Sequence, residues 1–156
     1  MEKKSKQSEF YQIGEIEVTY KNKVKASERP LIRDSQDVFK LFSQKWDANR
    51  IDLVEQFMVM YLNRANHVLV IHEISSGGIT GTVADPRIIL AIALKLAAVN
   101  IILAHNHPSG HLKPSRADEE LTQKIKEAGN YFDIKLLDHL IITSEKYFSF
   151  ADEGLL

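Results

Sequence analysis

Apolar residues recur along this chain at two spacings, one typical of strands and the other of helices. Residues 10–20 alternate between apolar and polar side chains, which predicts a strand. After a polar connection, Asp34 or Ser35 is expected to cap a helix. The apolar face of that helix consists of Val38, Leu41, Phe42 and Trp46.

Further apolar runs predict four more strands. Residues 54–62 and 68–74 are joined by the turn-like tetrapeptide 63–66, so we expect a hairpin. Residues 134–143 and 147–150 are expected to form the last two strands of the chain. Strands interleaved with helices predict an α/β domain in which helices flank a mixed sheet.

Between the hairpin and the most apolar strand, we expect a helix. Asp85 and Pro86 provide an N-cap and a first-turn proline, and the helix should continue to about Val99. Arg87 and Lys95 are its only charged residues, which predicts burial on nearly all sides. The apolar run that follows suits a central strand, and this strand ends at two histidines.

These histidines begin the segment with the clearest chemistry. Residues at positions i and i+2 of a strand point the same way, so His105 and His107 can present their rings to one point. After seven intervening residues, Ser115 is a candidate N-cap, which places Asp118 in the first turn of a helix. Three protein ligands of these types leave a fourth position for water, as in catalytic zinc sites.

Asp118 also has a simpler interpretation. Ser-x-x-Asp before an apolar run is similar to a capping box, so Asp118 could serve only the end of the helix. It lies, however, three residues before Leu121, on the apolar stripe that includes Ile125 and Ala128. An unpaired buried carboxylate is costly, and a cation shared with the two histidines would give Asp118 a partner.

Composition narrows the function classes without selecting one. The chain has 156 residues, enough for one domain with a sizeable core. Its net charge of -1 gives no overall attraction to nucleic acid, and the cluster of Lys3, Lys4 and Lys6 is typical of a solvated tail. The lack of cysteine excludes disulfides, thiolate zinc sites and zinc nucleoside deaminases. No signal peptide or membrane-spanning segment is apparent, so we expect a cytoplasmic location.

The spacing of the histidines, Ser115 and Asp118 resembles the signature of JAMM metallopeptidases. More narrowly, the segments 105–110 (His-Asn-His-Pro-Ser-Gly), 114–118 (Pro-Ser-Arg-Ala-Asp) and 137–139 (Leu-Asp-His) resemble the RadC family of bacterial proteins. The resemblance extends from about residue 33 to the end of the chain. It implies a JAB/JAMM architecture, similar to that of cytidine deaminases, and hydrolysis of an amide or isopeptide bond in a peptide or protein.

The same resemblance implies roles for individual residues. His105, His107 and Asp118 would hold one Zn²⁺ per chain. Glu55 opens an otherwise apolar strand, and the general base of JAMM enzymes is likewise a Glu at the start of an apolar strand, although acids that flank strands are commonly solvated. Glu73, at the end of the next strand, is the alternative base.

Three further residues receive an expected role. Ser115 could donate its hydroxyl proton to the reacting carbonyl oxygen, and we expect this role to compete with helix capping for the one hydroxyl. Asp138 and His139 are expected to form an internal polar pair, which either orients a ligand imidazole or has a structural role.

The resemblance also divides the chain. Residues 1–33 are expected to be an N-terminal extension with one strand, too short for the helix-hairpin-helix region of many RadC proteins, and residues 34–156 the JAB/JAMM domain. Gly77 and Gly78 depart from the Gly-Thr that relatives usually have there.

Two other functions remain as hypotheses. RadC proteins have been associated with DNA repair, so the chain could be a non-enzymatic repair factor. Two histidines and one carboxylate also occur in iron oxygenases, although those enzymes generally have all-β barrels, and helices flank the motif in this sequence.

Overall fold

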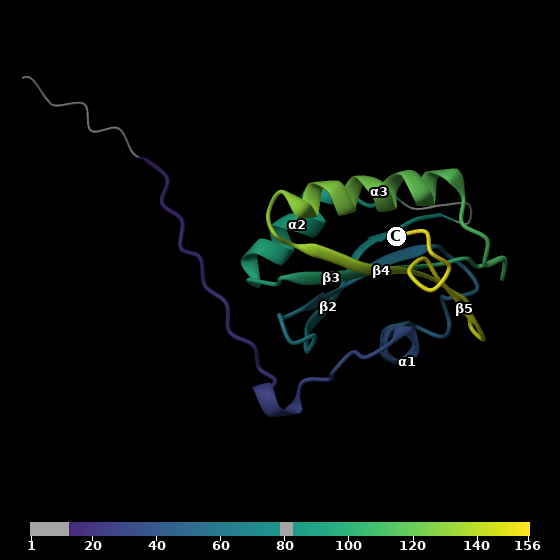
Figure 1. Ribbon diagram of the computed structural model, residues 1–156, viewed down its shortest axis with the longest axis horizontal. Coiled ribbons are helices and arrows are strands. Elements are labelled where there is room, and N and C mark those ends of the chain that lie inside the picture. The colour runs from purple at the N-terminus through teal and green to yellow at the C-terminus, as the bar shows by residue number, and fades with distance from the viewer. Residues whose placement is uncertain (1–12, 79–82) are drawn as a thin grey trace, which may run out of the picture.

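A single sheet organises the chain and places the strand that ends at the two predicted histidine ligands at its centre. The computed structural model describes residues 13–78 and 83–156. In these ranges the strands form a five-stranded sheet in the order β2-β1-β3-β4-β5 (Figure 1). The strands are β1 Gln56–Leu62, β2 Val68–Ser76, β3 Asn100–Asn106, β4 Lys135–Ile142 and β5 Tyr147–Ser149. The helices are η1 Ala26–Glu28, a short 3-10 helix, α1 Ser35–Lys45, α2 Pro86–Lys95 and α3 Arg116–Asn130.

The sheet is mixed, as the sequence predicts. Strand β1 is antiparallel to both β2 and β3, and β4 is antiparallel to β5. Strands β3 and β4 are parallel, and α3 provides the crossover that a parallel pair requires. The predicted hairpin and the predicted central strand are both confirmed.

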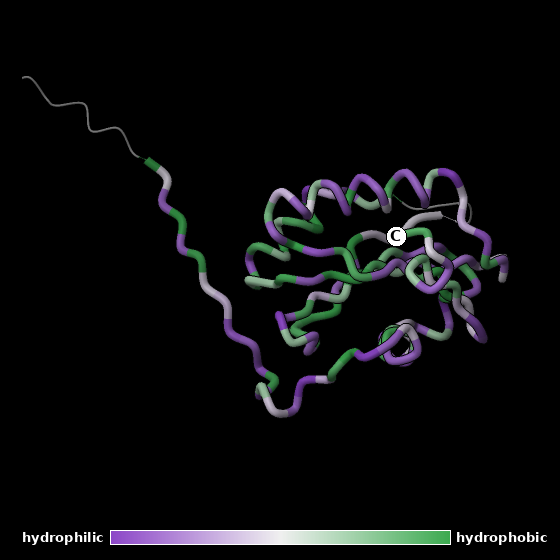
Figure 2. The backbone as a smooth tube through the Cα atoms, viewed as in Figure 1, coloured by the Kyte–Doolittle hydropathy of each residue, from purple (hydrophilic) through white to green (hydrophobic). Residues whose placement is uncertain are grey.

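Helices cover both faces of the sheet (Figure 1). On one face, Ile89 of α2 and Ile125 of α3 belong to the same buried cluster as Leu103 of β3. On the other face, Phe42 of α1 is buried in a cluster with Met60 of β1. Hydrophilic and hydrophobic residues alternate along α3, consistent with one buried face (Figure 2). These layers confirm the α/β prediction. Within the described ranges, no helix has the length and apolar character that crossing a membrane requires.

Helix α2 differs from the prediction at its end and in its burial. It ends at Lys95 and does not reach Val99, because Ala97 adopts a φ of 50°, outside the helical region. Ile88 and Leu94 are 49% and 53% exposed, so α2 is buried on one face only. Helix α2 packs on one face of the sheet, so only the side of the helix that contacts the sheet and α3 needs to be apolar.

The N-terminal strand prediction is wrong for the residues that can be examined. Residues 10–12, like the lysine cluster, lie outside the described ranges, and residues 13–20 are extended without strand pairing. Ile16 and Val18 are 88% and 69% exposed. An alternating pattern produces a strand only where neighbouring backbone groups complete its hydrogen bonds. We call residues 13–20 the N-terminal arm.

Candidate metal centre

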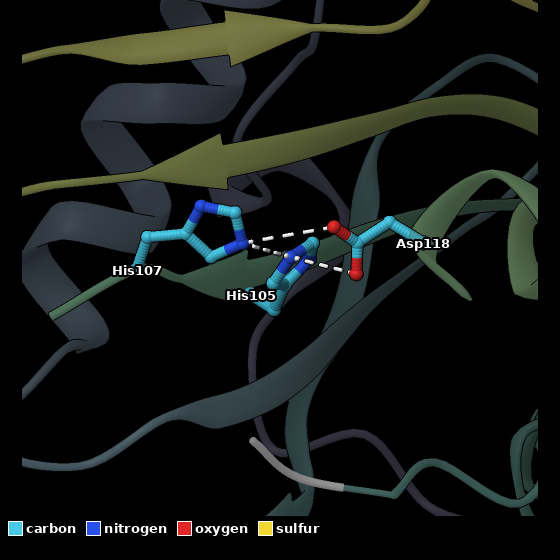
Figure 3. Close-up of side chains that lie close together, drawn as sticks. All are labelled: His105, His107 and Asp118. Atoms are coloured by element: carbon cyan, nitrogen blue, oxygen red, sulfur yellow. Dashed lines mark hydrogen bonds and ion pairs between the residues drawn. The ribbon is translucent and has the colours of Figure 1, made fainter. Parts of the chain in front are cut away.

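The end of β3 and the start of α3 bring the three predicted ligands together. His105 is near the end of β3 and His107 follows the strand, and their Nε2 atoms lie 3.0 Å apart. Asp118 lies in the first turn of α3 and points toward both rings (Figure 3). Its Oδ1 lies 3.3 Å from Nε2 of His105, and its Oδ2 lies 3.7 Å from Nε2 of His107.

The donor set fits a zinc ion in both chemistry and spacing. Imidazole nitrogens and a carboxylate oxygen are ordinary zinc ligands, and ligand atoms around a tetrahedral zinc lie ~3.4 Å from one another. The two Nε2 atoms lie 3.0 Å apart, and each faces a different oxygen of Asp118, at 3.3 Å for His105 and 3.7 Å for His107, so each separation is near that value. His107 and Asp118 each keep 16% of their side-chain surface exposed, so the site opens to solvent on one side.

The electrostatics of the site favour a cation. Burial raises the pKa of Asp118, but the imidazoles of His105 and His107 beside its carboxylate outweigh burial and hold this pKa well below its usual range. Asp118 in turn raises the pKa of His107 by more than burial lowers it. The carboxylate is therefore ionised across the physiological pH range and attracts positive charge to the histidines.

Both histidines are oriented through the ring nitrogen that faces away from Asp118. The Nδ1 of His107 lies 2.7 Å from the carbonyl oxygen of His111. Because a carbonyl only accepts, Nδ1 carries the proton and Nε2 is directed at the site. His111 thus contributes its backbone, whereas its side chain is exposed.

The Nδ1 of His105 lies 2.8 Å from Nε2 of His139, which is fully buried. The ring of Phe150 stacks on His139 at 4.8 Å between centroids. Thr122 Oγ1 lies 2.6 Å from the other nitrogen of His139. Sequence reasoning missed Thr122, although its position four residues after Asp118 places both on the same face of α3.

Asp138 and His139 separate onto opposite faces of the sheet. His139 pairs in register with Leu103, on the face covered by α2 and α3, whereas Asp138 pairs with Ile102, on the α1 face. Among the described residues, the hydrogen bonds to the Asp138 carboxylate come from Ser149 Oγ and the backbone NH groups of His139 and Ala151. Burial raises the pKa of Asp138. His139, and not Asp138, therefore contacts the imidazole of His105, whereas the carboxylate of Asp138 bonds to the backbone and to Ser149.

Ser115 and Asp118 form the capping box of α3, and Asp118 also faces the two histidines. The Ser115 hydroxyl oxygen accepts from the backbone NH of Asp118 at 3.1 Å, and Asp118 Oδ2 accepts from the backbone NH of Ser115 at 2.7 Å. The capping box therefore does not compete with the approach of Asp118 to the histidines. Nor does it use the hydroxyl proton of Ser115, because capping requires only a lone pair, and the expected competition does not arise.

Glu55 lies beside the site through the register of β1 against β3. Phe57 pairs with His105, so the antiparallel register extended by two residues places Glu55 opposite His107. Its negative charge contributes to the raised pKa of His107. Gly77 and Gly78, which stand where relatives usually have Gly-Thr, bond to the backbone of Glu55. Gly77 N donates to Glu55 O at 2.8 Å, and Glu55 N donates to Gly78 O at 3.3 Å.

Glu73 lies on the other face of the sheet. It pairs in register with Met58, whose side chain belongs to the cluster under α1. Its Oε2 accepts a hydrogen bond from Gln56 Nε2 at 2.8 Å. The structure therefore brings Glu55, and not Glu73, to the face that carries the histidines.

Asn106, between the two histidines, is a buried residue whose role sequence reasoning missed. Its Oδ1 accepts from Gln56 N at 2.7 Å, and its Nδ2 donates to the carbonyl oxygens of Ile51 and Val54 at 2.7 and 2.9 Å. These bonds tie the segment that precedes β1, including Glu55, to the strand that carries the ligands. A polar amide at the end of an apolar run, at a position where the neighbouring strand is buried, was the available signal.

The sequence profile of one family, RadC-like JAB domain, matches residues 32–155. The chain belongs to this RadC-like JAB domain family. Among its relatives, a UPF0758 protein of Flavobacterium johnsoniae is 52% identical over 101 residues, which cover 65% of this chain and 44% of the relative. The UPF0758 protein YfjY of Escherichia coli is 42% identical over 102 residues, 65% of this chain and 64% of YfjY. A UPF0758 protein of Aquifex aeolicus is 38% identical over 125 residues, 80% and 52% of the two chains.

These comparisons confirm the family expected from the sequence, and the RadC-like JAB assignment agrees with the mixed sheet and its flanking helices. The matching segment spans about half the length of most of the relatives named above. A JAB fold can bind zinc and is compatible with metal-dependent hydrolysis. The names of the relatives state no activity.

Proposed function

We propose that this chain is a zinc-dependent hydrolase of the JAMM type that cleaves an amide or isopeptide bond in a peptide or protein. The observation that supports this most strongly is the convergence of His105, His107 and Asp118, whose ligand atoms lie within 4.8 Å of one another. The partial exposure of two of these ligands gives a substrate access to the site. The proposal assigns one zinc ion to each chain.

When bound, the zinc ion would polarise the scissile carbonyl and lower the pKa of a water molecule toward ~7. Glu55, opposite His107 on the same face, would accept a proton from the attacking water and later deliver it to the leaving amine. Ser115 would donate its hydroxyl proton to the carbonyl oxygen as negative charge develops there. His105 and His107 are held in place through His139 and the backbone of His111.

The two other hypotheses have less support. An iron oxygenase would use the same three ligands, but the site lies in a helix-flanked mixed sheet and not in an all-β barrel. A DNA repair factor would be expected to present a strongly basic surface, whereas the chain has 20 basic and 21 acidic residues.

Metal analysis combined with an isopeptide substrate tests the proposal. Protein purified and then supplied with equal amounts of zinc and iron should retain close to one zinc per chain and cleave a fluorogenic isopeptide. His105→Ala should lose both, because two ligands rarely hold zinc where three did, whereas His72→Ala, on an exposed position of β2, should retain both. Preferential retention of iron, or unchanged zinc in His105→Ala, would contradict the assignment.

A further inference from the structure

Three hydrogen bonds form a continuous chain behind the metal centre. Thr122 Oγ1 donates to the backbone carbonyl of Asp118 at 2.6 Å and also lies 2.6 Å from Nδ1 of His139. Nε2 of His139 then lies 2.8 Å from Nδ1 of His105. This series of hydrogen bonds connects α3, β4 and β3, and it begins at Asp118 and ends at His105, two of the proposed ligands.

The position of every proton in this series of hydrogen bonds follows from the direction of the first bond, from Thr122 to the carbonyl of Asp118. A carbonyl oxygen has no proton, so the single hydroxyl proton of Thr122 must point to Asp118. The hydroxyl can then only accept from His139, which places the His139 proton on Nδ1. Burial of His139 favours its neutral form, so its Nε2 is an acceptor. His105 must therefore donate from Nδ1, and its Nε2 presents a lone pair toward His107 and Asp118.

We propose that Thr122 and His139 are positioning residues that set the ring tautomer of His105. Only the Nε2 lone pair of His105 faces the other two ligand atoms, so the opposite tautomer would direct an N–H bond at the cation. The consequence for zinc affinity rests on the proposed function, whereas the tautomer itself is a property of the protein without zinc.

Thr122→Val and Thr122→Ser form a matched pair for the test. Valine keeps the shape of threonine but removes the acceptor for His139 Nδ1, so His139 should change tautomer and force the proton of His105 onto Nε2. Serine keeps the hydroxyl. Nitrogen-15 chemical shifts of the histidine rings in zinc-free protein report the tautomer directly. We expect the parent and Thr122→Ser to hold the His105 proton on Nδ1 and Thr122→Val to move it.

Zinc affinity gives a second measurement. It should fall ~10–100-fold in Thr122→Val, the usual effect of losing an outer hydrogen bond to a ligand, and stay near the parent value in Thr122→Ser. A parent spectrum with the His105 proton on Nε2 would overturn the inference without any variant, even if Thr122→Val fails to fold. If the predicted tautomers are found but the parent binds no zinc, the proposed function fails and the hydrogen-bond assignment stands.

A second, independent observation concerns the N-terminal arm and the edge of the sheet. The arm leaves the domain beyond η1 (Figure 1), and it alternates apolar with polar residues (Figure 2). Ile16, Val18 and Tyr20 are 88%, 69% and 40% exposed. Apolar residues at strand spacing on an extended segment indicate a strand that lacks its neighbour in the isolated chain.

Strand β2 offers a complementary edge. It is the end strand of the sheet among the described residues, and its beginning is covered on the outer side, where Leu31 pairs with His67 and Val68 N donates to Pro30 O. The side chain of Asn22 donates to the carbonyl of Leu69, which fixes the base of the arm near this edge. Between Val70 and Glu73, no strand pairs with the outer side of β2 among the described residues.

We infer that the arm of one chain pairs with β2 of a second copy, and that two chains exchange arms reciprocally. An exposed, apolar edge strand is a template for pairing with another chain. The arm extends away from its own β2 beyond Asn22, so a second copy is the partner within reach of its strand-forming residues. Each exchanged arm would form backbone hydrogen bonds with the outer edge of β2 in the other copy, and its apolar side chains would be covered by that copy.

The lack of cysteine in the sequence makes a clean cross-linking experiment available. Glu17→Cys and His72→Cys would be prepared as separate proteins, mixed and oxidised. We expect a disulfide-linked dimer that contains one chain of each kind, and less of it when Val18→Lys is added to the arm. Thr19→Lys, on the opposite side of the arm, is the matched control and should leave the yield unchanged.

Light scattering after gel filtration gives the mass without any cross-link. The parent should be a dimer, and protein lacking residues 1–20 should be a monomer with an unchanged melting temperature, because the arm contributes little to the core. A monomeric parent, or a cross-link that forms only within one chain carrying both cysteines, would overturn arm exchange.

Discussion

Glu55 and His107 each lie two residues from the Phe57–His105 pair of β1 and β3, and the charge of Glu55 contributes to the raised pKa of His107. The two side chains therefore lie on the same face of the sheet. Glu73, one strand away, pairs with Met58 and lies on the other face. Under the proposed function, this arrangement makes Glu55, and not Glu73, the candidate general base.

Glu55→Gln should retain zinc and the fold while turnover falls roughly 10²–10⁴-fold, the usual contribution of a positioned proton-transfer group. The amide is nearly isosteric with the carboxylate, and all three ligands remain. Steady-state cleavage of the isopeptide substrate and zinc content would be measured together. Glu73→Gln is the control and should cleave at nearly the parent rate. A zinc-replete, inactive Glu73→Gln beside a normal Glu55→Gln would reverse the assignment of the base.

Zinc binding should release a proton from His107 near neutral pH. Asp118 raises the pKa of His107 above its ordinary 6.5, so this imidazole remains protonated to a higher pH than a free one. A proton and a metal compete for the same Nε2 lone pair. Affinity should therefore decrease steadily as pH falls from about 8 to about 6. Titration calorimetry in buffers of different ionisation enthalpy counts the released protons, and an affinity independent of pH over this interval would be inconsistent with the raised pKa.

Asn106→Ala should destabilise the fold by about 3 kcal/mol, since it removes three hydrogen bonds of a buried side chain, each worth about 1 kcal/mol. Urea denaturation measures the change in the free energy of unfolding. Asn100→Ala is the comparison, because Asn100 is only half-buried and donates two bonds, of 2.8 and 3.5 Å. A loss for Asn106→Ala no larger than that for Asn100→Ala would show that these bonds do not anchor the segment before β1.

DNA binding should be weak and strongly dependent on salt. The formal net charge is -1, so phosphate contacts would have to come from scattered lysines and arginines. Fluorescence anisotropy with duplex and branched DNA at physiological salt should give dissociation constants above the micromolar range. Sub-micromolar affinity that disappears on changing surface lysines or arginines would favour the repair hypothesis over hydrolysis.

The local sequence was enough to predict that His105, His107 and Asp118 come together and which elements carry them. His105 and His107 are two residues apart at the end of an apolar run, and Asp118 follows a helix cap, so near-neighbour geometry specifies how each side chain points. The hairpin, α1, α3 and the final strands were predictable for the same reason. Each depends on a spacing or a cap within a few residues.

Only the tertiary structure distinguished among residues with similar local signals. Sheet register placed Glu55, and not Glu73, on the face of the histidines, and strand alternation separated His139 from its neighbour Asp138. The same dependence explains the arm, whose alternating pattern forms no strand within its own chain. Register and strand pairing connect residues far apart in sequence, and a single local pattern is compatible with several such pairings until the whole sheet is assembled.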